Sequence, residues 1–109
     1  MNALFRVDAS LEIGLGHLMR CLTIAQFLQL KGWECGFACS GNCYLTVRNV
    51  VGPKLNIVKL PDALERQMSL LRSVYPRGVT LLIVDHYSLG VDFQRACRPW
   101  AKKILAIDD

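Results

Sequence analysis

Val79-Thr80-Leu81-Leu82-Ile83-Val84 is the stretch that decides the fold of this 109-residue chain. The run is almost wholly apolar and rich in branched residues, which is typical of a strand covered on both faces in a parallel sheet. It therefore predicts an interior strand of an α/β protein.

Outward from this strand, the chain alternates between strand-like and helix-like segments. Further strands are predicted at residues 4–8, 33–40, 55–60 and 103–107, and helices at 17–31, 44–50, 62–74 and 91–98. This alternation predicts a Rossmann-like parallel sheet with right-handed crossovers and helices on both faces. The helix at 17–31 has few polar positions, so most of its circumference is expected to be buried. Asp62 is a candidate N-cap for the helix that follows it.

Length and composition predict one globular domain spanning residues 1–109. Apolar residues make up 52% of the chain, which excludes a disordered polypeptide. There is no run of 18 apolar residues and no signal-peptide pattern at the N-terminus, so we expect a cytoplasmic protein without a membrane span. The net charge of +4 suits an anionic ligand, but no cluster of basic and aromatic residues indicates nucleic acid.

The five cysteines, at positions 21, 35, 39, 43 and 97, are an odd number without a secretion signal, which argues against a disulfide framework. The even spacing of Cys35, Cys39 and Cys43 raises the question of a metal site. Structural zinc sites usually contain a second ligand pair further along the chain, and none occurs here. We therefore expect buried apolar side chains and no metal.

Gly14-Leu15-Gly16-His17 follows the first predicted strand and opens the first helix. Ligands of open parallel sheets bind beyond the carboxyl ends of the strands, and a helix N-terminus offers free N–H groups to an anion. Gly14, Leu15 and Gly16 are thus candidate substrate-binding residues. The alternative is a turn that needs only the backbone freedom of glycine.

His17 is the candidate catalytic residue, because it lies in the first turn of that helix. The positive end of the helix dipole disfavours an imidazolium, and a neutral imidazole can accept a proton from water or a hydroxyl. A surface or capping histidine is the alternative. Asp8, at the end of the first strand, is expected to anchor the glycine loop. Arg20 could pair with an acid such as Asp8 or face an anionic group, and the structural pairing is the expected role.

Asp85-His86-Tyr87 follows the strongest strand, and therefore lies at the same edge of the sheet as His17. Asp85 and Tyr87 are candidate substrate-binding residues. Equally, the three residues could tie down a loop. We draw no conclusion from Asp108 and Asp109, which close the sequence.

Two common nucleotide motifs are missing from the glycine loop. The dinucleotide fingerprint requires a third glycine where this chain has Met19, and an acid at the end of the second strand, which closes with Cys39-Ser40. The phosphate-loop pattern of ATPases and GTPases does not occur either. No cofactor is therefore expected.

Four blocks of the sequence resemble one enzyme family. They are Phe5-Arg6-Val7-Asp8-Ala9-Ser10, Ile13-Gly14-Leu15-Gly16-His17-Leu18-Met19-Arg20-Cys21-Leu22, Ile83-Val84-Asp85-His86-Tyr87 and Leu105-Ala106-Ile107-Asp108-Asp109. In order and spacing they resemble the UDP-sugar hydrolases of pseudaminic acid biosynthesis, which are related in fold to the MurG-type glycosyltransferases. The block around His17 is specific, whereas the others mean little alone.

This resemblance implies a GT-B-like enzyme of two Rossmann-like domains, with the active site between them. It implies that water cleaves the anomeric C–O bond of a UDP-linked 2,4-diacetamido-2,4,6-trideoxy sugar, with inversion and without a metal. His17 matches the family's catalytic histidine, which acts on the attacking water, and Tyr87 matches a tyrosine at the same site.

The resemblance also implies that residues 1–109 are the N-terminal part of such an enzyme. The family's second domain supplies most contacts to the uracil nucleotide and has no counterpart in these residues, so a C-terminal domain is expected to dock on this one. Two alternatives stay open: a MurG-like glycosyltransferase domain, and a non-catalytic fragment.

Overall fold

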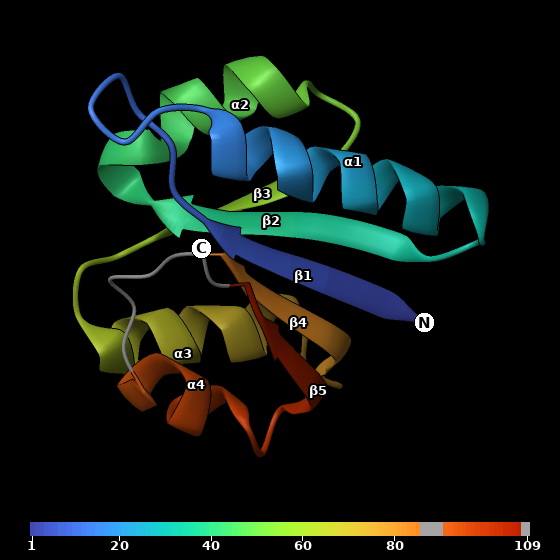
Figure 1. Ribbon diagram of the computed structural model, residues 1–109. Coiled ribbons are helices and arrows are strands. Elements are labelled where there is room, and N and C mark those ends of the chain that lie inside the picture. Colours follow the sequence, from blue (N-terminus) through green and yellow to red (C-terminus); the bar gives the residue numbers. More distant parts are fainter. Residues whose placement is uncertain (86–90, 108–109) are drawn as a thin grey trace.

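The computed structural model describes residues 1–85 and 91–107, and in these ranges the Rossmann-like α/β sheet is confirmed (Figure 1). One five-stranded sheet has the order β3-β2-β1-β4-β5, and every neighbouring pair is parallel. The strands are β1 (Asn2–Val7), β2 (Glu34–Ser40), β3 (Asn56–Leu60), β4 (Val79–Asp85) and β5 (Ala101–Ala106). The first strand therefore lies at the centre of the sheet, beside the strand that decided the fold.

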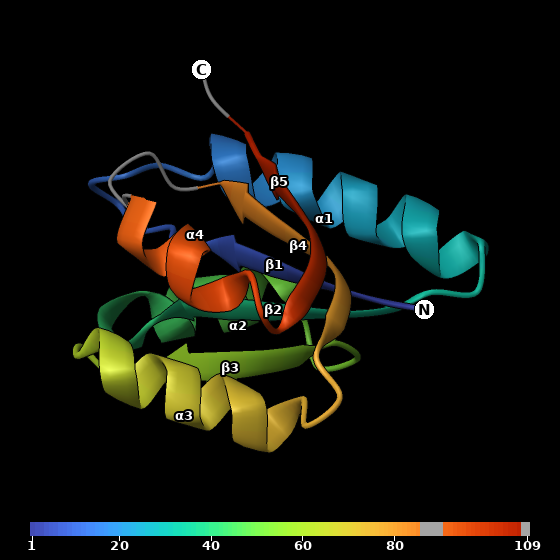
Figure 2. The same cartoon turned by 90° about the horizontal axis from the view of Figure 1, so that it is seen from below.

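Helices cover both faces of this sheet. On one face lie α1 (Gly16–Leu30) and α2 (Tyr44–Val51), which follows a short 3₁₀ turn (Gly41–Cys43), and on the other lie α3 (Leu64–Val74) and α4 (Val91–Cys97) (Figure 1). Figure 2 shows the second face, with α3 and α4 in front of the strands. The alternating direction of strand side chains divides the core between the two faces.

Each face has its own apolar cluster. Phe5 of β1 and Phe37 of β2 are fully buried and stack with their ring centroids 5.1 Å apart on the α1 side. Leu4 and Leu82 pack with Met68 and Phe93 on the other side. Because both faces are covered, residues 3–7 of β1 are all buried.

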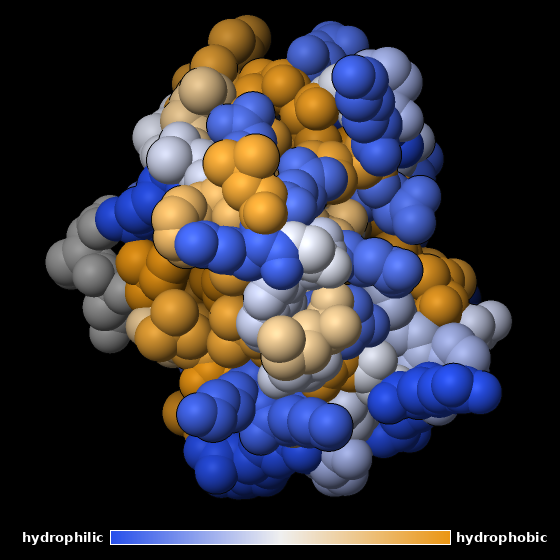
Figure 3. Space-filling view, turned by 90° about the vertical axis from the view of Figure 1, so that its right-hand side faces the viewer, coloured by the Kyte–Doolittle hydropathy of each residue, from blue (hydrophilic) through white to orange (hydrophobic). Residues whose placement is uncertain are grey.

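The expectation that most of the circumference of α1 is buried is wrong. Only Leu18, Cys21 and Ala25 of this helix are buried, whereas Phe27 and Leu30 are 58% and 86% exposed. The helix packs on the sheet along one stripe, and no described element covers its outer side. Figure 3 shows a side of the molecule on which hydrophobic residues, in orange, reach the surface between hydrophilic residues, in blue.

Two element boundaries also differ from prediction. Asp62 does not cap α3, because the chain stays extended through Ala63, which is the N-cap residue and makes no side-chain capping bond. Strand β5 begins at Ala101, two residues earlier than predicted, because Ala101 pairs with Val79 at the start of β4. Other element ends shift by one or two residues, as is usual for helix and strand boundaries.

The register places the carboxyl ends of the central strands level with one another. Val7 of β1 is the partner of Asp85 in β4, and Arg6 of β1 is the partner of Ala38 in β2. Side chains that follow these strands therefore share one edge of the sheet. Within the described ranges, no helix is long and apolar enough to cross a membrane.

Candidate functional site

The loop between β1 and α1 is closed by a compact turn. The N–H of Gly14 donates to the carbonyl of Ser10 at 2.7 Å, and the N–H of Ile13 donates to the Ser10 hydroxyl at 3.1 Å. Gly14 has a φ of +90°, a conformation that residues with a Cβ rarely adopt. The turn itself therefore accounts for this glycine.

Gly16, the first residue of α1, is different. Its φ is not positive, and a Cβ added there would meet no atom of the described residues within 4 Å. Glycine in a helix costs up to about 1 kcal/mol relative to alanine. Residues 1–85 and 91–107 therefore give no reason for glycine at position 16, one residue before His17.

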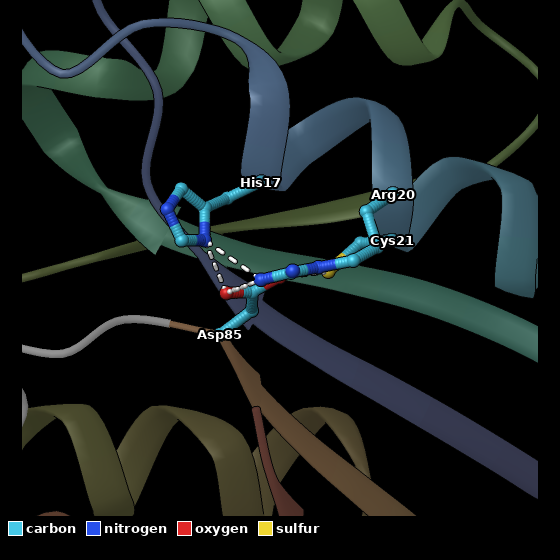
Figure 4. A network of polar contacts seen from close by, with 4 residues as sticks. All are labelled: His17, Arg20, Cys21 and Asp85. Carbon is cyan, nitrogen blue, oxygen red and sulfur yellow. Dashed lines mark hydrogen bonds and ion pairs between the residues drawn. The ribbon is translucent and has the colours of Figure 1, made fainter. Parts of the chain in front are cut away.

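His17 and Asp85 are brought together as the sequence predicted for one edge of the sheet. His17 Nδ1 lies 2.5 Å from Asp85 Oδ1, and the other ring nitrogen faces away from Asp85 (Figure 4). The His17 side chain is 24% exposed, whereas that of Asp85 is fully buried. An imidazole held at the protein surface by a buried carboxylate is suited to proton transfer.

Asp85 also receives hydrogen bonds from two other residues of α1. Arg20 donates through Nε and Nη2 to the two carboxylate oxygens at 2.9–3.1 Å, and Cys21 Sγ donates to Oδ2 at 3.4 Å. Burial disfavours the carboxylate, but the hydrogen bonds from Arg20, His17 and Cys21 outweigh burial and lower the pKa of Asp85. Asp85 is therefore a buried anion in a charged network.

Helix periodicity explains how α1 supplies all three donors. His17, Arg20 and Cys21 are spaced i, i+3 and i+4, so they share one face of the helix, and this face meets the end of β4. Cys21 was not among the predicted site residues, and Arg20 was expected to pair with an acid such as Asp8 or to face an anionic group. The spacing from His17 was the signal that would have placed both residues at this site.

A second polar network lies on the opposite face of the sheet. Asp8 accepts hydrogen bonds from Arg6 at 2.8 Å and from the backbone N–H and hydroxyl of Ser40 at 2.7 Å. Asp8 is thus a structural anchor, and these hydrogen bonds join the end of β1 to the end of β2. Its expected contact with the glycine loop stays a prediction. Arg6 is almost wholly buried, and its Nε has no hydrogen-bond partner among the described atoms.

Other predicted site residues fall outside the described part of the chain. These are Tyr87 and its neighbour His86. Asp108 and Asp109, to which no role was assigned, also lie outside the described residues. Leu15 is the N-cap residue of α1, gives no side-chain capping bond, and is 44% exposed.

The cysteines lie where the sequence analysis placed apolar side chains. Cys39 and Cys43 are buried and Cys35 is half-buried, and burial raises the pKa of the Cys39 thiol to about 12. Residues 1–85 and 91–107 contain no group of three His, Cys, Asp or Glu side chains placed to hold a metal ion.

The lowered pKa of Asp85 predicts how stability depends on pH. Its stabilising effect is complete above about pH 4, where the unfolded carboxyl is also ionised, and is lost as pH falls through the lower folded value. We expect the free energy of unfolding to fall more steeply between pH 5 and about pH 2 in the unaltered chain than in Asp85→Asn. Urea unfolding across this range measures the difference, and parallel curves would contradict the prediction.

The fold and this site define a Rossmann-like α/β domain with a histidine–carboxylate pair at the carboxyl edge of its sheet. Over 110 aligned residues the chain is 29% identical to the UDP-2,4-diacetamido-2,4,6-trideoxy-beta-L-altropyranose hydrolase of Campylobacter jejuni. The alignment covers all of this chain and 37% of the hydrolase, so the chain spans little more than a third of this relative. This likeness supports a distant relationship. No family model matches the chain, and no solved structure matches it.

Proposed function

We propose that this chain is the His17-bearing domain of an enzyme that hydrolyses a UDP-linked 2,4-diacetamido-2,4,6-trideoxy sugar, as in pseudaminic acid biosynthesis. The observation that carries the proposal is the pairing of His17 with buried Asp85 beside a glycine loop. The similarity to a hydrolase named for such a sugar supports the substrate class.

The proposed reaction is a displacement at the anomeric carbon. Water attacks that carbon and transfers one proton to His17, while the C–O bond to UDP breaks and UDP leaves with the bonding electrons. The products are UDP and the free sugar with inverted configuration. The loop of Gly14, Leu15 and Gly16 shapes the pocket, Tyr87 contacts the substrate, and no cofactor takes part.

An isotope experiment tests this reaction. The chain of residues 1–109, and the longest polypeptide that its reading frame encodes, are incubated with the UDP-sugar in H₂¹⁸O. We expect ¹⁸O in the anomeric hydroxyl of the sugar and none in the UDP. Label in the phosphate would show attack at phosphorus, and the absence of UDP release from both proteins would refute the proposal.

Gly16→Ala tests whether the glycine loop adjoins the substrate. Since the added methyl group has open space, we expect the free energy of unfolding to rise by up to about 1 kcal/mol. We also expect kcat/KM to fall by about tenfold or more, a loss of about 1.4 kcal/mol in transition-state stabilisation, because the methyl group would occupy space next to His17. Urea unfolding and steady-state kinetics measure the two effects. Increased stability with unchanged kinetics would show that Gly16 does not adjoin the substrate.

A MurG-like glycosyltransferase is the second candidate, because a base at His17 could accept a proton from an acceptor hydroxyl as readily as from water. Product analysis separates the two reactions, since hydrolysis gives a free sugar and transfer gives a new glycoside. The third candidate is a domain without catalysis of its own.

Exposed apolar side chains support a partner domain for this chain. Met19, Phe27 and Leu30 of α1 and Leu105 of β5 are all between 47% and 86% exposed. We propose that a second, nucleotide-binding domain docks on this chain and completes the site. A domain that covers these side chains would remove their apolar surface from water.

A further inference from the structure

We infer that Asp85 is a positioning residue: its buried carboxylate fixes His17 as the Nδ1–H tautomer, so that Nε2 is the atom that accepts a proton. The part of this inference that concerns catalysis rests on the proposed function. Asp85 was a candidate substrate-binding residue in the sequence. The donors that surround its buried carboxylate favour the positioning role.

One hydrogen lies between the side chains of His17 and Asp85. At 2.5 Å, His17 Nδ1 and Asp85 Oδ1 must share a hydrogen, because two facing lone pairs would repel at this distance. Arg20 binds both carboxylate oxygens and stabilises the ionised acid. The hydrogen therefore belongs to Nδ1.

Arg20 Nη2 also lies 3.0 Å from His17 Nδ1. A nitrogen that carries a hydrogen in the ring plane has no lone pair left to accept another. The short Arg20–His17 distance therefore results from both groups binding one carboxylate.

The Asp85 carboxylate is closed to solvent. Its side chain is fully buried, and Arg20, His17 and Cys21 donate to its two oxygens. A carboxylate already bound on this side by three donors has little capacity for a substrate hydroxyl. What it controls is the orientation of the imidazole, as second partners of functional histidines commonly do.

The direct test is nuclear magnetic resonance of the folded chain, labelled with ¹⁵N in histidine. Long-range ¹H–¹⁵N spectra, recorded at a pH where the imidazole is neutral, show which ring nitrogen carries the hydrogen. We expect a protonated Nδ1 and a bare Nε2 for His17. A bare Nδ1 with a protonated Nε2, or a doubly protonated ring at every pH at which the chain is folded, would overturn the inference.

Asp85→Asn gives a second, independent readout. Arg20 would take the amide oxygen of the asparagine, so the amide NH₂ would face Nδ1 and favour the Nε2–H tautomer. The matched control is Asp62→Asn, the same substitution at an exposed acid that does not cap α3, and it should leave the tautomer unchanged. An Nδ1–H tautomer that persists in folded Asp85→Asn would show that the carboxylate does not set it.

Kinetics distinguish positioning from substrate binding. We expect Asp85→Asn to lower kcat by about 100-fold or more and to change KM by less than about threefold. A raised KM with unchanged kcat would show that Asp85 binds the substrate and would overturn the inference. An Nδ1–H tautomer in a chain that releases no UDP in any form would count against the proposed reaction and leave the positioning of His17 intact.

Discussion

His17→Ala is expected to lower kcat for UDP release by about 100-fold to 10,000-fold, a loss of about 3 to 5 kcal/mol in transition-state stabilisation. The reason is that the substitution removes the group that is proposed to take the proton of the attacking water. KM should change little, because the glycine loop and the rest of the pocket remain. Steady-state kinetics on the longest encoded polypeptide measure both constants.

Two controls make this result specific to His17. Gln29→Ala changes an exposed residue in the last turn of the same helix and should leave kcat unchanged. Added imidazole should restore part of the activity of His17→Ala, since the missing side chain leaves room for it, and should not affect Gln29→Ala. Undiminished activity in His17→Ala would remove this residue from the mechanism.

Gly78→Ala is expected to destabilise the fold by about 3 kcal/mol or more. Gly78 has a φ of +77°, and a Cβ there would lie 2.0 Å from the carbonyl oxygen of Trp100. This carbonyl accepts the N–H of Val79 where β4 and β5 begin to pair. The substitution therefore combines backbone strain with a clash against a carbonyl that the sheet needs.

Gly14→Ala is the matched comparison. Its φ of +90° gives similar backbone strain, but among the described residues no atom lies within 4 Å of the added Cβ. We expect a loss of about 1 to 2 kcal/mol for this variant. The difference between the two variants in urea unfolding isolates the clash with Trp100, and equal losses would contradict the packing at Gly78.

The sequence predicted the sheet well because strand and helix patterns are local. The apolar run of β4 identifies its strand without tertiary information. The end of α1 is also local, because Gly32, with a φ of +86°, follows the C-cap residue Lys31 as helix-ending glycines commonly do. Parallel strands then place their carboxyl ends at one edge, which is why His17 and Asp85 could be placed together.

Pairings between distant residues could not be predicted in the same way. Helix spacing could place Arg20 on the same face as His17, but it does not say which acid Arg20 binds, because the partner Asp85 depends on the strand order that places β4 beside β1. The exposed side of α1 could not be predicted either, because an apolar sequence does not tell which of its residues a neighbour covers. The roles of Gly14, Leu15, Gly16 and Tyr87 stay predictions.

The central position of β1 in the sheet has a consequence for how the site responds to partial unfolding. Strands β1 and β4 are each paired on both sides, whereas β3 and β5 are each paired on one side only within the described sheet. Backbone amides of doubly paired, buried strands exchange with solvent last, because their exposure requires the most cooperative opening. Asp85 ends one of these strands, and the loop before His17 follows the other. The backbone amides of β1 and β4 should therefore stay protected from deuterium exchange after those of β3 and β5 have exchanged. The contact between His17 and Asp85 should then persist when the edge strands open.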